Sequence, residues 1–527
     1  MPPTKTGTHY HNGTELRAVS DDLDDALSTV ASEGSVVFLG LVIELGISFL
    51  AKLVIARVLG PLEYGVVSLG VTTMVVVSTL VLGGLDIGVA RFLPRFEDAS
   101  DRRGVLIAAF GIALPIAVAA GGVVVAFAPA IATKLFRDPA VIPVLRVFGP
   151  IIPVAALLKL DVGVSQGLEA ARPKVLIRNI ILPITRFVAI AVVIVAGLGA
   201  VGVAWAYGVA YFCAATVGLF IVARETSLFD RTISPTPYKR RLVAFSLPLV
   251  ISAAMTFIFS DVDTFMLGYF SPTADVGTYN TVYPLAHLLV VPMSSVGFIV
   301  MPVLSRLHER GDTDTMATLY QRTTKWIFLG AFPIFGLLVC FPTELIGLTF
   351  GSAYTHGATA LLVLSLAFFT HAIAGPNLDC LTAIGKTRLV MLDDLIVALL
   401  NMGLNLLLIP RLSFLGAAIA TAVAYGTLNV LYTTQLYRAT GMHPLSKSLG
   451  TIALGATLLL ITVVGTLGWL LTAPYRELLL TVFLFGGGYL VFCLRVGIDE
   501  RELELLDGVD QRFDTNLRDR VEWFART

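Results

Sequence analysis

The stretch Ala56–Gly70, "ARVLGPLEYGVVSLG", joins two strongly apolar segments through a short interruption that contains Gly60, Pro61 and Gly65. Glycine permits a tight backbone and proline presets a turn, so the stretch predicts a sharp connection between two helices. The rest of the fold can be worked out from this turn and from the segments on either side of it.

A similar turn occurs again about 212 residues later. The stretch Gly268–Asn280, "GYFSPTADVGTYN", also interrupts an apolar segment and carries Pro272 and Gly277. The pair Leu198–Gly208 ("LGAVGVAWAYG") and Leu415–Gly426 ("LGAAIATAVAYG") keeps a similar offset. A recurrence at a fixed offset indicates an internal repeat.

The apolar segments are long enough to cross a bilayer. The chain has 527 residues, of which 56% are hydrophobic and only 14% are charged, a composition typical of a membrane protein. A spanning helix needs about 20 mainly apolar residues to cross roughly 30 Å of hydrocarbon. We predict an all-α polytopic membrane protein with fourteen spans, at residues 35–59, 65–90, 104–129, 141–168, 175–197, 199–224, 242–270, 276–302, 326–350, 357–384, 389–410, 414–437, 448–472 and 476–495.

Charge and cysteine content exclude several classes of function. The formal net charge is zero, which argues against nucleic acid as a partner. The four cysteines are far apart and have no His or Cys at ligand spacing, so we expect no metal site, and we expect no cofactor. The connections between spans are short, which leaves no room for an extramembrane catalytic domain and predicts that the protein is not an enzyme.

The basic residues of the short connections predict the orientation of the chain. Lys and Arg gather after the even-numbered spans, as in Arg102, Arg103, Lys239 and Arg240, and are sparse in the alternate connections. Positive charge marks cytoplasmic loops, so both termini are expected in the cytoplasm and both turns on the outer side.

The two copies of the turn have the same direction because six spans, an even number, separate them. We therefore predict two parallel six-helix repeats around a central cavity, plus two C-terminal helices. The expected division is a cytoplasmic or interfacial N-terminal segment, an N-terminal lobe, a cytoplasmic linker, a C-terminal lobe, two additional spans and a cytoplasmic tail, at residues 1–33, 34–225, 226–241, 242–440, 441–495 and 496–527.

Three stretches carry a resemblance to a known family. They are "ARVLGPLEYGVVSL", "GLDIGVARFLPRF" (Gly84–Phe96) and "DVDTFMLGYFSPTADVGTYN" (Asp261–Asn280). The chain resembles, over about residues 34–495, the polysaccharide transporter or oligosaccharide flippase family of the multidrug/oligosaccharidyl-lipid/polysaccharide exporter superfamily.

The resemblance implies a function in the plasma membrane. It implies that the protein moves a lipid-linked oligosaccharide, on a polyprenyl or dolichyl phosphate carrier, from the cytoplasmic to the outer leaflet by alternating access. It also implies that spans one, two, seven and eight line the cavity while the lipid tail stays among the membrane lipids. Glycan-assembly enzymes are further expected partners. The alternatives are a cation-coupled multidrug exporter of the same superfamily and a membrane enzyme of polysaccharide assembly.

Ionisable residues inside apolar spans are the candidate substrate-binding residues. Placing a charged side chain at a helix centre in the membrane costs about 2.5 to 3.5 kcal/mol, so its presence there indicates a function. Glu44, Ser48 and Lys52 share one face of the first span at a spacing of four. This face lines a polar cavity or forms a structural ion pair. Arg186 follows the helix-breaking Pro183 and binds a lipid phosphate or sugar, or the carbonyls that the proline frees.

Asp86, Arg91 and Arg95 lie near the inner end of the second span and complete the substrate-binding candidates. Arg91 and Arg95 are expected on one helix face, where a cytoplasmic vestibule would meet a lipid phosphate. Ordinary positive-inside anchoring is the alternative explanation.

Asp261, Asp263 and His287 are the coupling-ion candidates, on the seventh and eighth spans. Two residues rotate a helix by about 200°, so only one of the two aspartates is expected to face the cavity. His287 is a protonatable partner or a packing residue.

A further set of charged residues is assigned to inner helix ends, where snorkelling to the interface accounts for them. These residues are Lys159, Asp161, Asp379, Asp393 and Asp394.

Overall fold

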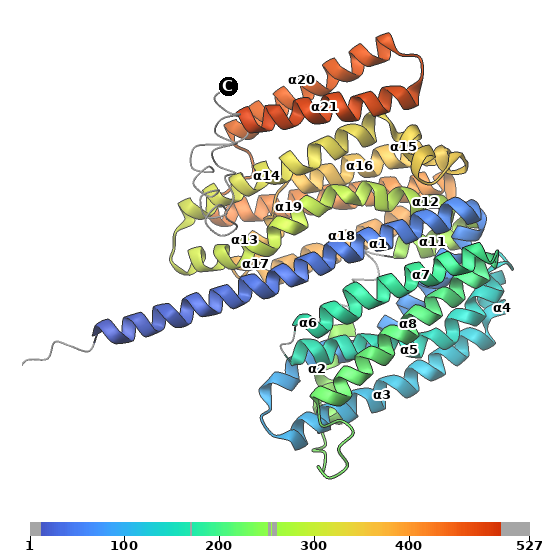
Figure 1. The fold of residues 1–527 in the computed structure, drawn as a ribbon, viewed down its shortest axis with the longest axis vertical. Helices are drawn as coiled ribbons and strands as arrows, with labels where there is room; N and C mark the ends of the chain where they lie inside the picture. Colours follow the sequence, from blue (N-terminus) through green and yellow to red (C-terminus); the bar gives the residue numbers. More distant parts are fainter. Residues whose placement is uncertain (1–11, 169–170, 251–254, 256–260, 497–527) are drawn as a thin grey trace, which may run out of the picture.

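The computed structural model of the chain describes residues 12–168, 171–250, 255 and 261–496 (Figure 1). The predicted tail 497–527 and residues 1–11 of the N-terminal segment lie outside this range. Every regular element in the described part is helical, which confirms the all-α prediction.

The first half of the chain forms a bundle, here named the N-terminal bundle, in which α5 packs against α1, α3 and α8. Its elements are α1 (Asn12–Leu82), α2 (Leu85–Phe92), η1 (Leu93–Arg95), α3 (Ala99–Ala126), α4 (Ala128–Ala130), the π-helix η2 (Ile131–Leu135), α5 (Val141–Gly167), α6 (Ala171–Lys174), the π-helix η3 (Val175–Ile181), α7 (Leu182–Val195) and α8 (Gly199–Glu225).

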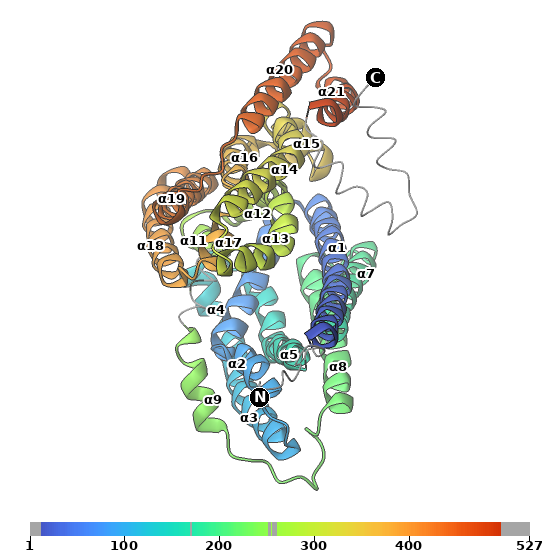
Figure 2. The same ribbon diagram turned by 90° about the vertical axis from the view of Figure 1, so that its left-hand side faces the viewer.

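A second bundle, here named the C-terminal bundle, follows α9 (Lys239–Ser246), which lies beside α2 and α3 (Figure 2). The elements of the C-terminal bundle are α11 (Val262–Phe270), α12 (Thr273–His287), η4 (Leu288–Val290), α13 (Val291–Glu309), α14 (Thr313–Cys340), α15 (Pro342–Thr349), η5 (Ser352–Gly357), α16 (Ala358–Ile373), α17 (Asn377–Ala383), α18 (Thr387–Leu412) and α19 (Phe414–Thr440).

Two further helices, α20 (Lys447–Leu470) and α21 (Pro474–Val496), pack against each other and against α14. Figure 1 shows this pair at the edge of the molecule, beyond the C-terminal bundle. Large apolar side chains are exposed on the surface, among them Val195 at 90%, Trp469 at 85% and Phe483 at 73%. Water would not tolerate so many exposed apolar groups, so the chain is a multi-pass membrane protein.

The described residues contain eleven helices long and apolar enough to span a membrane, or up to twelve if a pair bent by 46° at residues 297–300 is one span. The predicted number of fourteen is therefore not confirmed. Part of the difference lies in Leu39–Leu82, whose 44 residues count as one helix although the sequence predicts two spans there. A straight helix of that length would measure about 66 Å, roughly twice the hydrocarbon thickness. The seventh predicted span, 242–270, falls partly on residues outside the described range.

Gly60 divides α1 where the sequence predicts a turn. Its φ of 76° and ψ of 175° are not helical, and the chain turns back there (Figure 1). A left-handed φ favours glycine because it has no Cβ. Pro61 follows. At the offset of 212 residues, Pro272, the residue before α12, takes the place of Gly60, with an extended backbone.

Two predicted spans have different boundaries in the structure. The second was expected to run over 65–90, but α1 ends at Leu82 and Gly83 and Gly84 take φ values of 50° and 81°. The ninth was expected at 326–350, but α14 covers 313–340. It begins early because the Asp312 carboxylate accepts the Thr315 backbone N–H, a helix cap that hydropathy does not detect.

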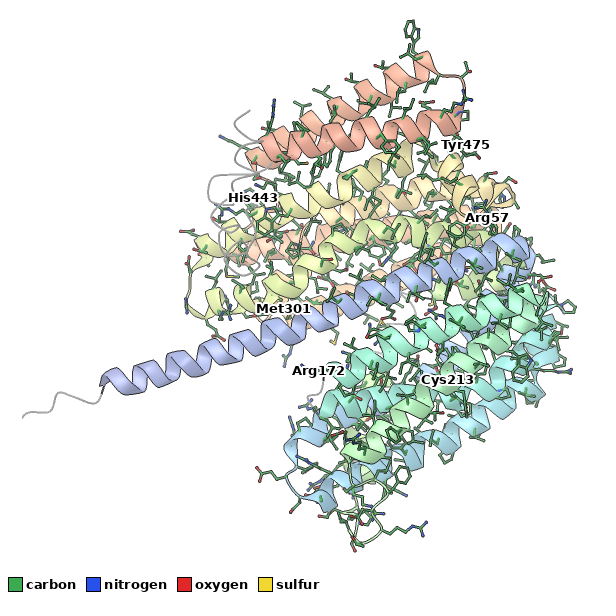
Figure 3. The ribbon with its side chains drawn as sticks, viewed as in Figure 1. Arg57, Arg172, Cys213, Met301, His443 and Tyr475 are labelled. Carbon is green, nitrogen blue, oxygen red and sulfur yellow. The ribbon has the colours of Figure 1, made fainter. Side chains whose placement is uncertain are left out.

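The expected orientation can be tested at the two ends of the bundles. Figure 3 shows Arg57 near one end, here named the outer end, and Arg172 and His443 toward the other. In a variant without cysteines, we expect Ala353→Cys in η5 to react with an impermeant maleimide in intact cells, because this residue is exposed at the outer end. Arg231→Cys, in the exposed linker after α8, should react only after permeabilisation. The reverse pattern would invert the orientation.

Candidate functional site

The two turns of the repeat meet at the outer end. A Cβ built on Gly65 would overlap the Thr273 carbonyl oxygen, and a Cβ on Gly277 would overlap the Pro61 carbonyl oxygen. Gly65 and Gly277 are 212 residues apart, and so are Pro61 and Thr273. The contact is therefore reciprocal, as between two symmetric subunits, and it requires glycine at both positions.

Side-chain hydrogen bonds hold the bundles together around this contact. The Thr273 hydroxyl donates to the Asp138 carboxylate at 2.5 Å, and the Tyr354 hydroxyl donates to the Ala56 carbonyl at 2.8 Å. The Arg57 guanidinium donates to the Leu348 carbonyl at 2.6 Å. Each bond joins the N-terminal to the C-terminal bundle, so the structure is closed at its outer end.

Each turn also carries an acidic residue that binds the N-terminal end of a long helix of its own bundle, α8 or α19. The Glu63 carboxylate accepts the Ala200 backbone N–H at the start of α8, at 3.0 Å. The Asp275 carboxylate accepts the hydroxyl of Ser413, the residue before α19, at 2.5 Å. An acidic group at a helix N-terminus is favourable, and here it fixes each turn on its bundle.

Beneath the outer end, Lys52 of α1 faces both bundles. Its ammonium lies within electrostatic range of Arg186 on α7 and of Asp261, the residue before α11. The Arg186 guanidinium donates to the Ser48 hydroxyl at 2.6 Å and lies 5.4 Å from the centre of the Tyr207 ring. Lys52 and Arg186 therefore share a region at the interface, although they are far apart in sequence.

Lys159 joins this group, contrary to its assignment to the membrane interface. Its ammonium donates to the Thr79 hydroxyl at 2.5 Å and interacts electrostatically with Asp86, Arg178 and Asp261. Lys159 lies eight residues before the end of α5 at Gly167, more than two turns inside the helix. This depth within the helix is the signal in the sequence that could have identified Lys159 as a member of the group.

Glu44 lies on the same side of α1 and accepts a hydrogen bond from the Asn179 amide at 2.5 Å. Together these residues form what we name the charged group, which holds four basic and three acidic side chains: Lys52, Lys159, Arg178, Arg186, Glu44, Asp86 and Asp261. All but Asp261 come from the N-terminal bundle, and the group has a net charge of +1.

Asp263 points elsewhere, into the C-terminal bundle. Its carboxylate accepts hydrogen bonds from the Tyr279 hydroxyl at 2.5 Å, the Thr421 hydroxyl at 2.7 Å and the Asn405 amide at 2.6 Å. Asn405 also donates to the Asn401 amide oxygen at 3.0 Å, while its own amide oxygen is buried without a partner. Several polar groups thus meet at one half-buried carboxylate.

His287 lies between the two sites, at the end of α12. Its ring stacks on Tyr283, with centroids 5.8 Å apart, and meets the Phe368 ring edge to face at 5.3 Å. Lys52 and His371 are its charged and titratable neighbours. The aromatic packing fixes the imidazole beside the charged group.

Arg91 and Arg95 lie apart from the charged group. Both are exposed. The Arg91 guanidinium lies 4.6 Å from the centre of the ring of Phe245, a residue of α9. The α-helix ends at Phe92 and continues as the short 3₁₀ helix η1, so the expected common α-helical face is interrupted. Arg91 thus helps to fix α9 against α2.

Two residues assigned to snorkelling are buried instead. Asp161 is 0% exposed and lies against Gly218 of α8, and Asp393 is 3% exposed and accepts the Gln435 amide at 2.9 Å. Snorkelling needs a side chain that reaches the interface, so the assignment is wrong for both.

Comparison with known proteins establishes the class and then the family. A profile described as polysaccharide biosynthesis protein matches residues 54–359, more than half of the chain, and one described as lipid II flippase MurJ matches residues 237–489. The chain belongs to the polysaccharide biosynthesis protein family, which confirms the resemblance seen in the turns.

Two curated relatives match part of the chain. MJ1068, a membrane protein of Methanocaldococcus jannaschii, is 29% identical over 206 residues, 38% of this chain and 39% of the relative. A protein of Haloferax volcanii named probable low-salt glycan biosynthesis flippase Agl15 is 25% identical over 196 residues, 37% of this chain and 41% of the relative. The chain spans about two fifths of the length of these relatives.

Solved structures share the fold. The lipid II flippase MurJ in an inward closed conformation has a TM-score of 0.69 at 16% identity, covering 88% of this chain and 98% of that chain. An inward-facing multidrug resistance MATE transporter has a TM-score of 0.63 at 16% identity, covering 75% and 94%. Both solved structures therefore share the fold of this chain.

The glycine contact predicts matched effects in the two copies. We expect Gly65→Ala and Gly277→Ala each to hinder closure of the outer end, because either methyl group would overlap a carbonyl oxygen. Overpacking costs about 1–3 kcal/mol, which shifts a two-state equilibrium by about five- to 150-fold. The measurement is transport or complementation of glycan assembly at matched protein level.

Gly122→Ala is the control, since the added Cβ would have no neighbour within 4 Å. An effect of Gly65→Ala without one of Gly277→Ala would show that the two turns are not equivalent.

Proposed function

We propose that the protein is a flippase that moves a lipid-linked oligosaccharide from the cytoplasmic to the outer leaflet of the plasma membrane by alternating access. The observation that carries the proposal is the charged group, which lies at the interface of the bundles beneath a closed outer end. The family match and the printed name of the Haloferax relative support the class of substrate.

The charge balance of the group suits a lipid phosphate. A polyprenyl or dolichyl phosphate carrier brings negative charge into a region of low dielectric, where desolvation is costly. Lys52, Lys159 and Arg186 offset that charge, and Asp261 moderates their mutual repulsion. The site binds and releases its substrate without chemical conversion, so the protein acts as a transporter that serves glycan-assembly enzymes. In this proposal, both termini are cytoplasmic.

Within the group, Lys52 and Arg186 have different surroundings. Arg186, which is also half-buried, already has the Ser48 hydroxyl and the Tyr207 ring as partners, and among the described residues only its Nε is buried without one. Lys52 is half-buried between a cation and an anion. We therefore assign Lys52 to the phosphate, and Arg186 to holding the α1 face in place.

A cation-coupled drug exporter is the second candidate, because the MATE transporter shares the fold. Its cargo would be a cation, which a net positive group repels. Native mass spectrometry of the purified protein separates the two: a co-purifying lipid-linked glycan supports the flippase, whereas retention of added cationic dyes without such a lipid supports the exporter.

The proposed role of Lys52 can be tested with one variant that removes its charge and one that keeps it. We expect Lys52→Ala to lower transport about tenfold or more, since a hydrogen bond to a charged group contributes about 1.5–3 kcal/mol. Lys52→Arg should keep much of the activity, and membrane abundance should stay near that of the wild type. The measurement is complementation of surface-glycan assembly with quantified protein.

Lys134→Ala, at an exposed lysine of η2, is the matched control. If Lys52→Ala instead lowers abundance and thermal stability, Lys52 is a structural partner of Asp261, because removing it leaves a buried charge unpaired.

Asp263 is the coupling-ion candidate with the most support. Its half-buried carboxylate lies beside the buried amide groups of Asn401 and Asn405, whose oxygens complete a set that suits a proton or an alkali cation. Asp261 belongs to the charged group, and His287 lies against aromatic rings, so both are assigned to the substrate side.

A coupling ion at Asp263 should stabilise the protein. At a hundredfold excess over Kd, a bound ligand adds about 2.7 kcal/mol to the free energy of unfolding. We expect the melting temperature to rise with sodium over choline, or with falling pH, and Asp263→Asn to abolish that rise. Asp379→Asn, at a half-buried carboxyl of α17, is the control. An unchanged response of Asp263→Asn would remove this residue from coupling.

A further inference from the structure

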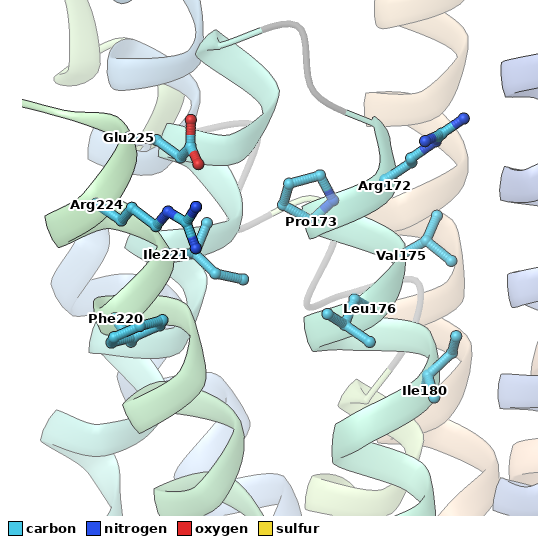
Figure 4. A pocket seen from close by; sticks show the side chains of 9 residues that line it. All are labelled: Arg172, Pro173, Val175, Leu176, Ile180, Phe220, Ile221, Arg224 and Glu225. Carbon is cyan, nitrogen blue, oxygen red and sulfur yellow. The ribbon is translucent and has the colours of Figure 1, made fainter.

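A second site lies on the outside of the N-terminal bundle, between α8 and the segment formed by α6 and η3. It is a cavity of about 450 Å³, in the size range of small-molecule sites. Leu176 and Ile180 form one wall and Phe220 and Ile221 the other (Figure 4). Phe220 is 66% exposed and Leu176 is 41% exposed, so the walls face the surroundings of the protein, which in a membrane are lipid chains.

The rim of this cavity is charged. Arg172 comes from α6 and Arg224 from the last turn of α8, and Figure 4 shows them on opposite sides of the opening, with Glu225 beside Arg224. Within the described part of the chain, neither arginine has a hydrogen-bond or ion-pair partner. Two guanidinium groups and one carboxylate leave a net charge of +1.

The cavity is separate from the charged group because η3 lies between them. On one side of η3, the Asn179 amide bonds the Glu44 carboxylate of α1. The other side presents Leu176 and Ile180 to the cavity. Because η3 is a π-helix, its turns are wider than those of an α-helix. Its two sides therefore lie in different environments, one facing the charged group and the other facing the cavity.

We propose that the cavity binds one anionic phospholipid of the cytoplasmic leaflet. The phosphodiester lies between Arg172 and Arg224, and the acyl chains run along Phe220 and Leu176. Basic residues at the cytoplasmic end of membrane helices attract anionic headgroups, by about 1 kcal/mol for each charge. The net charge of +1 matches one phosphodiester, and the apolar walls distinguish a lipid from free phosphate.

The bound lipid fills the cavity beside the contact between η3 and α8, so it stabilises this end of the N-terminal bundle. This role is independent of the proposed transport cycle, since the residues involved are outside the charged group. The site can therefore be tested by binding alone, in protein that has or lacks transport activity.

The experiment is native mass spectrometry of the full chain in detergent with phosphatidylglycerol or phosphatidylcholine added in equal amounts. We expect the wild type to retain one phosphatidylglycerol in preference to phosphatidylcholine. Arg172→Ala and Arg224→Ala should each reduce that preference about fivefold, the change that corresponds to about 1 kcal/mol for each charge. Ile221→Trp, which fills the cavity, should reduce retention of both lipids.

Arg438→Ala is the matched control, because Arg438 is an exposed arginine in the last turn of α19, outside the cavity. Equal retention of the two lipids by the wild type, or an unchanged preference in the double arginine variant, would overturn the proposal. Displacement of phosphatidylglycerol by equimolar polyprenyl phosphate would also overturn it, since the cavity would then be a site for the cargo.

Discussion

The arrangement of the two bundles depends on one steric constraint, the approach of two backbones where Gly65 meets Thr273 and Gly277 meets Pro61. A side chain at either glycine would separate the helices. The hydrogen bonds of Asp138, Arg57 and Tyr354 form around this contact and need the same short distance between bundles. The closed outer end is thus a property of backbone packing, to which the polar bonds add specificity.

Beneath that closed end the charges of the interface are mostly half-buried, so each gains from a partner of opposite charge. The N-terminal bundle supplies all four cations of the charged group, and Asp261 of the C-terminal bundle supplies an anion across the interface. A substrate phosphate would compete with Asp261 for the same ammonium groups. In the proposed cycle, substrate binding therefore weakens one link between the bundles, which is a physical way to couple occupancy to motion.

Local patterns in the sequence predict the turns, the helical class and the family, because glycine, proline and hydropathy act over short stretches. The charged group was predicted only in part. Lys159 was assigned to a helix end because hydropathy gives boundaries to within a few residues, and Asp161 was assigned there for the same reason. The surroundings of Asp263 could not be predicted, since its bonds to Asn405 and Thr421 join residues 142 and 158 positions apart. Only the packing of α11 against α18 and α19 brings them together.

The reciprocal form of the glycine contact also bears on the origin of the chain. A contact in which position i of one unit meets position j of the other, and j meets i, is the kind that two identical subunits form about a twofold axis. An ancestral helical unit that carried one such turn, and that always entered the membrane in the same orientation, would have been able to pair with its own copy. Duplication and fusion would then have preserved an existing dimer interface, and afterwards allowed the halves to diverge, one toward basic residues and the other toward the environment of Asp263.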